Sequence, residues 1–146
     1  MSDKQLAGLL AREAIRDLPL RYCDYVWRDD IEGIVSLFAA DGSFIAIFNG
    51  QETDCTGTAA LREFYVGGLE MKPRPYIHNH VFELTSDTTA SGRCYLDLRI
   101  GSNNMEWLGA GFYEDDYVKV GDDWKFQTRR FNALRMNEIP PGINQG

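Results

Sequence analysis

The sequence predicts an α+β domain, with helices in the first part of the chain and a meander of antiparallel strands in the second. Through the first part, apolar residues recur every three to four positions, which is typical of helices with one buried face. From Tyr76 onward, long segments rich in aromatic and branched residues alternate with short turn-forming sequences. Helices followed by strands indicate layers of α and β structure, whereas a parallel sheet requires alternating βαβ units.

The first predicted helix has an apolar face made of Leu6, Leu9, Leu10, Ile15, Leu18, Tyr22 and Tyr25. Pro19 lacks a backbone N–H and crowds the carbonyl four residues earlier, so we expect a kink or a new start there, with Asp17 available as a cap. A shorter helix should follow, capped by Asp29 or Asp30 and ending at the turn 41–42.

The remaining elements follow from the spacing of turn formers. Ser43 to Phe48 predicts a first strand, a polar connection containing Gly50 follows it, and Thr56 to Leu69 predicts a third helix. The later strands are predicted at Ile77 to Leu84, Gly92 to Ile100, Trp107 to Val120 and Trp124 to Met136. We interpret the tail, Ile139 to Gly146, as an irregular segment that covers a pocket mouth or a subunit seam.

Length and charge narrow the class of protein. A chain of 146 residues is one domain, spanning 1–146, that buries roughly two-thirds of its unfolded surface. The net charge of −7 disfavours nucleic acid and anionic membranes as partners. The apolar runs are too short to span a bilayer, and the start lacks a signal-peptide pattern, so we expect a cytoplasmic protein.

The cysteines and acids predict no metal site. Cys23, Cys55 and Cys94 lack the spacing of a disulfide framework or a zinc site. Asp115 and Asp116 alternate across a predicted strand, and we interpret them as solvated surface groups.

Several segments in order resemble a known family. In chain order they are the stretch from Ile15 to Cys23, then Leu37 to Gly42, Asn79 to Leu84, Ala90 to Leu96, Gly111 to Tyr117, and Gly121 to Phe126. Together they resemble the SnoaL-like, scytalone-dehydratase-like branch of the nuclear-transport-factor-2-like superfamily, over nearly the whole chain. The resemblance implies a cystatin-like α+β cone, with the N-terminal helices packed in the concave face of a strongly curved antiparallel sheet. It also implies a small-molecule pocket and cofactor-free dehydratase or related lyase chemistry.

The resemblance implies a catalytic pair, which this sequence lacks at the matching positions. In the family, an Asp near the end of the first helix orients a His at the start of a central strand. Those positions hold Trp27 and Pro75 here, while the family's first-helix tyrosine falls on Tyr22. Asp24, Asp29, His78 and His80 lie nearby in sequence, which leaves a shifted pair open.

The strand at Ile77 to Leu84 supplies the candidate acid/base. Strand alternation places Asn79 on one face and His78 with His80 on the other. If the strand faces the cavity as it does in the family, Asn79 is the inward residue. A bulge near Pro75 would bring His78 to the pocket as the catalytic histidine, in preference to His80. The alternative is a surface or interface histidine.

The late strands supply pocket residues by the same resemblance, with Arg129, Tyr113 and Leu98 matching lining positions of a dehydrochlorinase. An arginine among apolar and aromatic side chains would stabilise an enolate, a phenolate or a departing anion. The alternative is that Arg129 or Arg130 pairs with Asp115, Asp116 or another acid on the sheet surface. Aromatic residues of the helices would line the opposite wall, or else form plain core; these are Tyr22, Tyr25, Trp27 and Tyr65.

The sequence thus predicts a cofactor-independent lyase that eliminates water or a small fragment from an aromatic or alicyclic small molecule. Tyr22, His78 and Arg129 would carry the proton transfers, without a metal or cofactor. Two alternatives stay open, namely an isomerase or cyclase, and a non-catalytic ligand-binding or assembly subunit. An exposed sheet face further predicts a homo-oligomer, a dimer or a trimer.

Overall fold

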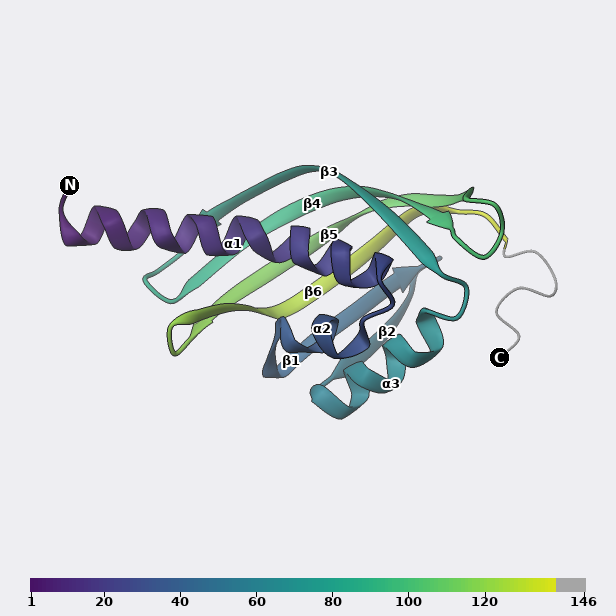
Figure 1. Ribbon diagram of the computed structural model, residues 1–146, viewed down its shortest axis with the longest axis horizontal. Helices are drawn as coiled ribbons and strands as arrows, with labels where there is room; N and C mark the ends of the chain where they lie inside the picture. Colours follow the sequence, from purple (N-terminus) through teal and green to yellow (C-terminus); the bar gives the residue numbers. More distant parts are fainter. Residues whose placement is uncertain (139–146) are drawn as a thin grey trace.

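The computed structural model describes residues 1–138, in which a curved sheet wraps around helices (Figure 1). The predicted tail falls outside the described residues. The helices are α1 (Asp3–Trp27), α2 (Ile31–Ser36) and α3 (Thr58–Gly68). The strands are β1 (Phe38–Phe48), β2 (Gln51–Thr56), β3 (Pro73–Leu84), β4 (Thr89–Ile100), β5 (Glu106–Val120) and β6 (Asp123–Met136).

The six strands form one open sheet in the order β2-β1-β6-β5-β4-β3. All neighbouring strands are antiparallel except β1 and β6, which run parallel. Figure 1 shows α1 crossing the concave side of this sheet, with α2 and α3 below its end. The α+β cone predicted from the sequence is therefore confirmed.

Helix α1 is continuous from Asp3 to Trp27, so the predicted new start at Pro19 is wrong. A reciprocal pair of bonds between Ser2 and Gln5 caps its start. Pro19 lies buried within the helix, on the face that packs against the sheet with Ile15, Leu18 and Tyr22. Burial of this face outweighs the one backbone hydrogen bond that proline removes.

The segment after α1 differs from the prediction in two places. Helix α2 ends at Ser36, and β1 begins at Phe38, because the stretch before Ser43 already joins the sheet beside β6. The expected polar connection contains β2, whose residues 51–56 pair with 43–48 of β1 and are almost all exposed. Asp30 caps α2 by accepting a hydrogen bond from the N–H of Gly33.

A bulge in β3 decides which histidine faces the interior. Ile77 pairs with Leu96 and His80 with Cys94, so two residues of β3, His78 and Asn79, lie opposite one residue of β4. The bulge was expected near Pro75, and its actual place keeps Ile77 and His80 on the inner face. His78 and Asn79 are exposed.

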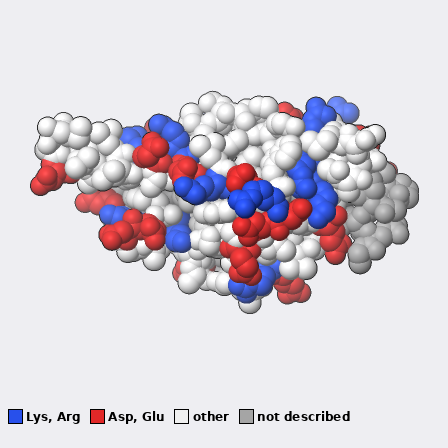
Figure 2. All heavy atoms as spheres, viewed as in Figure 1, with Lys and Arg blue, Asp and Glu red and all other residues white. Residues whose placement is uncertain are grey.

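Charged side chains of both signs lie among one another on the face shown in Figure 2. Surface pairs include Arg62 of α3 with Glu32 of α2 at 2.6 Å, and Lys72 with Asp29, both in connections between elements, at 3.2 Å. None of the helices formed by residues 1–138 is both long enough and apolar enough to cross a membrane.

Candidate functional site

A buried ion pair lies at the centre of the concave face. Arg129 of β6 and Asp115 of β5 are opposite each other in the ladder, and their side chains are completely buried. The Arg129 Nε lies 3.2 Å from Asp115 Oδ1. The interpretation of Asp115 as a solvated surface residue is therefore wrong, whereas its neighbour Asp116 does face outward.

Aromatic rings enclose the Arg129 guanidinium. Its central carbon lies 3.5 Å from the ring centroid of Tyr113, 4.3 Å from that of Tyr22 and 4.6 Å from that of Phe126. The negative faces of these rings favour a cation where water is excluded. The structure thus brings together three of the residues predicted from sequence, Tyr22, Tyr113 and Arg129.

The Arg129 guanidinium has unused hydrogen-bonding capacity. None of its three nitrogens makes a hydrogen bond to any described residue, and Asp115 Oδ1 makes none either. Buried polar groups normally have partners, because leaving one unsatisfied costs about 1–3 kcal/mol, and more when the group is charged. These N–H groups are therefore suited to receive an anionic or strongly polar acceptor.

A pair of phenol hydroxyls lies beside the guanidinium. The hydroxyl oxygens of Tyr22 and Tyr65 are 2.8 Å apart, so one of them donates to the other. Burial raises the pKa of both tyrosines, and of Tyr113, well above the ordinary value, so all three stay protonated. Whichever hydroxyl donates within the pair, the other keeps a proton to give to another acceptor.

A second chain of polar groups leads from Asp115 to the edge of the cone. The Tyr117 hydroxyl donates to Asp115 Oδ2 at 3.1 Å and lies 2.9 Å from His80 Nε2. Burial raises the pKa of Asp115 to about 6. Burial, followed by the cations of Arg129 and Arg16, lowers the pKa of His80 to about 4.

Sequence reasoning considered Asp115 only as a surface partner of an arginine, missed Tyr117, and ranked His80 below His78. The signal that was available is the alternation of β5, since Tyr113, Asp115 and Tyr117 must share one face of a regular strand. Once Tyr113 was placed inside, the other two followed. Within the described part of the chain, no three His, Cys, Asp or Glu side chains gather in a metal-binding arrangement.

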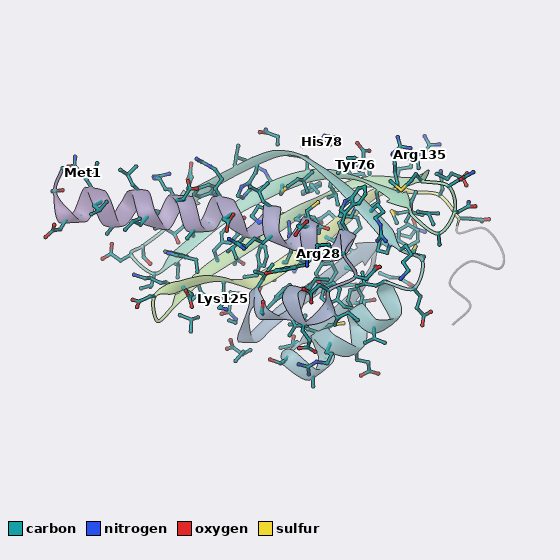
Figure 3. All side chains as sticks on the ribbon, in the orientation of Figure 1. Met1, Arg28, Tyr76, His78, Lys125 and Arg135 are labelled. Carbon is teal, nitrogen blue, oxygen red and sulfur yellow. The ribbon has the colours of Figure 1, made fainter. Side chains whose placement is uncertain are left out.

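His78 lies on the outer side of the sheet (Figure 3), whereas Tyr22 and Arg129 are buried inside the cone. Its Nε2 donates to Asp97 Oδ2 at 2.6 Å, and Trp107 Nε1 donates to the other carboxylate oxygen at 3.1 Å. The bond to His78 holds the pKa of Asp97 below its usual range. These residues line an open groove of about 680 Å³ together with Tyr76. Asn79 is also exposed.

Trp27 and Pro75 touch each other; these are the two positions at which the resemblance implied a catalytic pair. The Trp27 Nε1 donates to the Pro75 carbonyl at 2.7 Å, and the same carbonyl accepts from the Cys23 thiol at 3.2 Å. The Trp27 ring meets the Tyr76 ring edge-on, with 5.4 Å between the ring centroids. In this chain the two positions fasten the end of α1 to the start of β3.

We expect Trp27→Phe to lower the free energy of unfolding by about 0.5–1.5 kcal/mol, the net contribution of one hydrogen bond. A phenylalanine ring would still pack on Tyr76, so most of the loss comes from the N–H donor and the rest from the smaller ring. Urea unfolding of the variant and the wild type measures the difference. Equal stabilities would mean that this contact does not fasten α1 to β3.

The other predicted lining residues lie apart from the guanidinium contacts. The ring of Tyr25 packs against α2, where a Cβ on Gly33 would come within 2.6 Å of it. Leu98 is partly buried opposite Pro75 in the ladder. Of the predicted aromatic wall, Tyr22 and Tyr65 therefore lie next to the ion pair, while Tyr25 and Trp27 pack at the C-terminal end of α1.

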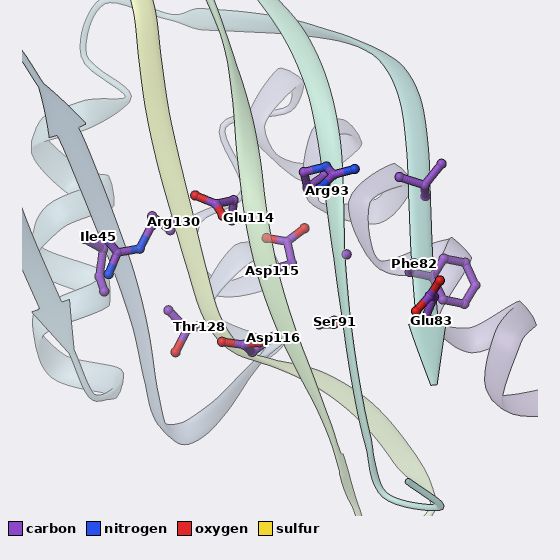
Figure 4. Close-up of a pocket in the computed structure, with 12 residues that line it drawn as sticks. Ile45, Phe82, Glu83, Ser91, Arg93, Glu114, Asp115, Asp116, Thr128 and Arg130 are labelled. Carbon is purple, nitrogen blue, oxygen red and sulfur yellow. The ribbon is translucent and has the colours of Figure 1, made fainter. Parts of the chain in front are cut away.

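The outer face of the sheet carries a second groove, of about 660 Å³ (Figure 4). It is lined mainly by charged and polar side chains, among them Arg93, Glu114 and Arg130. Arg130 pairs with Glu52 at 2.8 Å. Exposed apolar side chains also occur on this sheet, including Tyr95 and Leu134. The homo-oligomer stays a prediction.

Comparison with known proteins agrees with the fold described above. The family model of the SnoaL-like domain matches residues 7–130. A comparison with curated protein sequences gave no match.

Among solved structures, Rv3472 of Mycobacterium tuberculosis, a protein of unknown function, is 26% identical to this chain, with a TM-score of 0.75. The match covers 92% of this chain and 76% of that chain. A protein of Novosphingobium aromaticivorans provisionally named a scytalone dehydratase is 21% identical, with a TM-score of 0.78 and 95% and 94% covered.

An NTF2-like protein with a cystatin-like fold, also from Novosphingobium aromaticivorans, is 19% identical, with a TM-score of 0.78 and 90% and 86% covered. The family model spans most of the chain, and these structures share its fold. The chain therefore belongs to the SnoaL-like family, whose scaffold suits small-molecule catalysis or binding.

Proposed function

We propose that the protein is a cofactor-independent lyase that eliminates water or a small fragment from an aromatic or alicyclic molecule by proton transfer inside the cone. The observation that carries this proposal is the fully buried Arg129 guanidinium, whose nitrogens have no hydrogen-bond acceptor among the described residues. Burying a cation in this way is not needed for stability, because apolar side chains of similar volume in its place often give a fold that is equally stable.

The chemistry follows from what surrounds the guanidinium. Elimination beside a carbonyl develops negative charge on the carbonyl oxygen as the α-proton leaves. Arg129 and the neutral hydroxyl pair of Tyr22 and Tyr65 supply N–H and O–H donors in a region that excludes water. Donors fixed in a medium of low polarity stabilise such an oxyanion far more than the same groups do in water.

The aromatic surroundings favour the class of substrate. The rings of Tyr22, Tyr113 and Phe126 present flat surfaces around the charged group. Such surfaces pack well on an aromatic or alicyclic skeleton that carries one carbonyl or phenol oxygen. The name of the scytalone dehydratase-like neighbour supports elimination as the reaction to test first.

The test is a panel of aromatic and alicyclic β-hydroxy-ketones, with formation of the conjugated enone followed by ultraviolet absorbance. We expect turnover of at least one member, reduced about 10²–10³-fold in Arg129→Lys and in Tyr22→Phe, as for the loss of one oxyanion donor. Arg130→Lys, one residue away on the outer face, is the matched control and should keep its activity. Equal rates in Arg129→Lys, Tyr22→Phe and the wild type would contradict the proposal.

A second candidate function, a non-catalytic ligand-binding subunit, is favoured by one observation. Trp27 and Pro75 occupy the positions of the family's catalytic pair with a structural hydrogen bond. In that case calorimetry would detect binding of panel members that are not turned over, and Arg129→Lys would weaken this binding. Binding without product in the wild type would therefore select this candidate over the lyase.

A further inference from the structure

We infer that His80 is the proton acceptor of the interior site, and that Tyr117 and Asp115 hold it in the tautomer that this role requires. The inference rests on the proposed function for its chemistry, whereas the tautomer can be measured without any substrate. His80 is placed inside by the bulge in β3, opposite Cys94 of β4.

The tautomer follows from counting protons along the chain of hydrogen bonds. An ionised Asp115 can only accept, so the Tyr117 hydroxyl gives its single proton to Asp115 Oδ2 at 3.1 Å. The Tyr117 oxygen must then accept its other hydrogen bond, which comes from His80 Nε2 at 2.9 Å. His80 therefore carries its proton on Nε2 and a lone pair on Nδ1.

The nitrogen with the lone pair is the group that remains unused. His80 Nδ1 is buried and has no hydrogen-bond partner among the described residues. The ring of Phe82 stacks on the imidazole with 5.2 Å between ring centroids, and the ring of Tyr117 meets it edge-on with 6.2 Å between centroids. A fixed, neutral imidazole with a free lone pair is the form that a general base needs.

The groups that face His80 from other elements keep it neutral before reaction. Arg16 of α1 and Arg129 of β6 disfavour a positive charge on the ring, as does burial. Cys94 lies opposite it on β4, where burial raises the pKa of the thiol to about 11, so the thiol adds no charge. Asp115 on β5 carries the negative charge that a protonated His80 would need, relayed through Tyr117.

The proton transfer is then balanced. The C–H bond next to a substrate carbonyl breaks, its proton goes to His80 Nδ1, and the electron pair stays on the substrate as an enolate beside the Arg129 guanidinium. The Nε2 proton keeps its bond to Tyr117, so Tyr117 and Asp115 are positioning residues. Return of a solvent deuteron from His80 to the same carbon would complete an exchange without any elimination.

The experiment follows deuterium entering the α-carbon of 2-tetralone in D2O by proton NMR, corrected for the protein-free rate. His80→Gln keeps an amide N–H that can still donate to Tyr117, yet removes the basic nitrogen. We expect exchange to fall about 10²-fold or more in His80→Gln, the usual effect of losing a general base. Exchange should fall at least tenfold less in His78→Gln, which removes the other histidine of the chain.

The nitrogen-15 NMR spectrum of the imidazole rings at pH 8, above the pKa of Asp115, reports the tautomer separately. We expect His80 in the wild type to be protonated at Nε2, and this preference to weaken in Tyr117→Phe. Protonation at Nδ1, or exchange that persists in His80→Gln, would overturn the inference and leave the lyase proposal standing. If the wild type shows the Nε2 tautomer but no exchange, the relay is supported and the proposed proton abstraction fails.

Discussion

Replacing Arg129 with methionine should lower the free energy of unfolding by about 3–5 kcal/mol, because it leaves the carboxylate of Asp115 buried without its counter-ion. Both side chains are fully buried, and the pair is joined by a 3.2 Å contact. Methionine fills much of the arginine volume, so the loss reports charge more than packing. Urea unfolding at pH 7 measures the difference.

Arg130→Met is the matched control for this prediction. Arg130 is the next residue of the same strand, but its partner Glu52 and its own side chain are both partly exposed to solvent. An exposed pair contributes about 0–1 kcal/mol, so this variant should be nearly as stable as the wild type. Replacing both members of the buried pair, Arg129→Met with Asp115→Leu, should recover most of the lost stability. Equal losses at 129 and 130 would contradict the idea that burial sets the cost.

Most of the fold could be predicted because its long elements carry strong periodic patterns. The third helix and the four strands after it were found from their periodic patterns and turn formers; the observed helix is slightly shorter than predicted, and the strands begin one to four residues earlier. The exposed edge strand β2 was missed because residues 51–56 are polar and give no alternation to detect. Pro19 misled the helix prediction because the packing that keeps α1 continuous comes from distant strands.

The site was predicted in part, and the missed parts have different causes. Tyr22, Tyr113 and Arg129 came from resemblance, and the two tyrosine rings do pack against the buried guanidinium of Arg129. His78 was chosen over His80 because the position of a bulge cannot be read from local sequence, and one extra residue exchanges the faces of every side chain before it. The burial of Asp115, in contrast, could have been inferred from the alternation of β5, because Tyr113 on the same strand was already placed inside.

The stability contributed by Asp115 should fall as the pH rises from 4 to 7. Burial raises the pKa of this carboxyl from its ordinary 3.8 to about 6 in the folded protein. A raised pKa stabilises the fold fully below pH 4, where the carboxyl is protonated in both states, and this contribution is lost as the pH passes through 6. The free energy of unfolding of the wild type, minus that of Asp115→Asn, should therefore drop by roughly 3 kcal/mol over this interval.

The contribution of His80 to the free energy of unfolding should change with pH in the opposite direction over the same interval. The two residues can therefore be distinguished by the sign of the change. The pKa of His80 falls from 6.5 to about 4, so its contribution is present above pH 6.5 and is lost as the pH falls through 4. The difference in the free energy of unfolding between the wild type and His80→Gln should therefore rise between pH 4 and 7, by about 1–2 kcal/mol once the partial exposure of the ring is allowed for.

Urea unfolding of the two variants and the wild type at several pH values gives both curves. The variant His78→Gln reports what an imidazole on the outer face contributes. A flat curve for Asp115→Asn would mean that attraction to Arg129 cancels the effect of burial on this carboxyl, so that Asp115 titrates alike in the folded and unfolded protein. Curves of the same sign would mean that the two groups do not lie in one buried network.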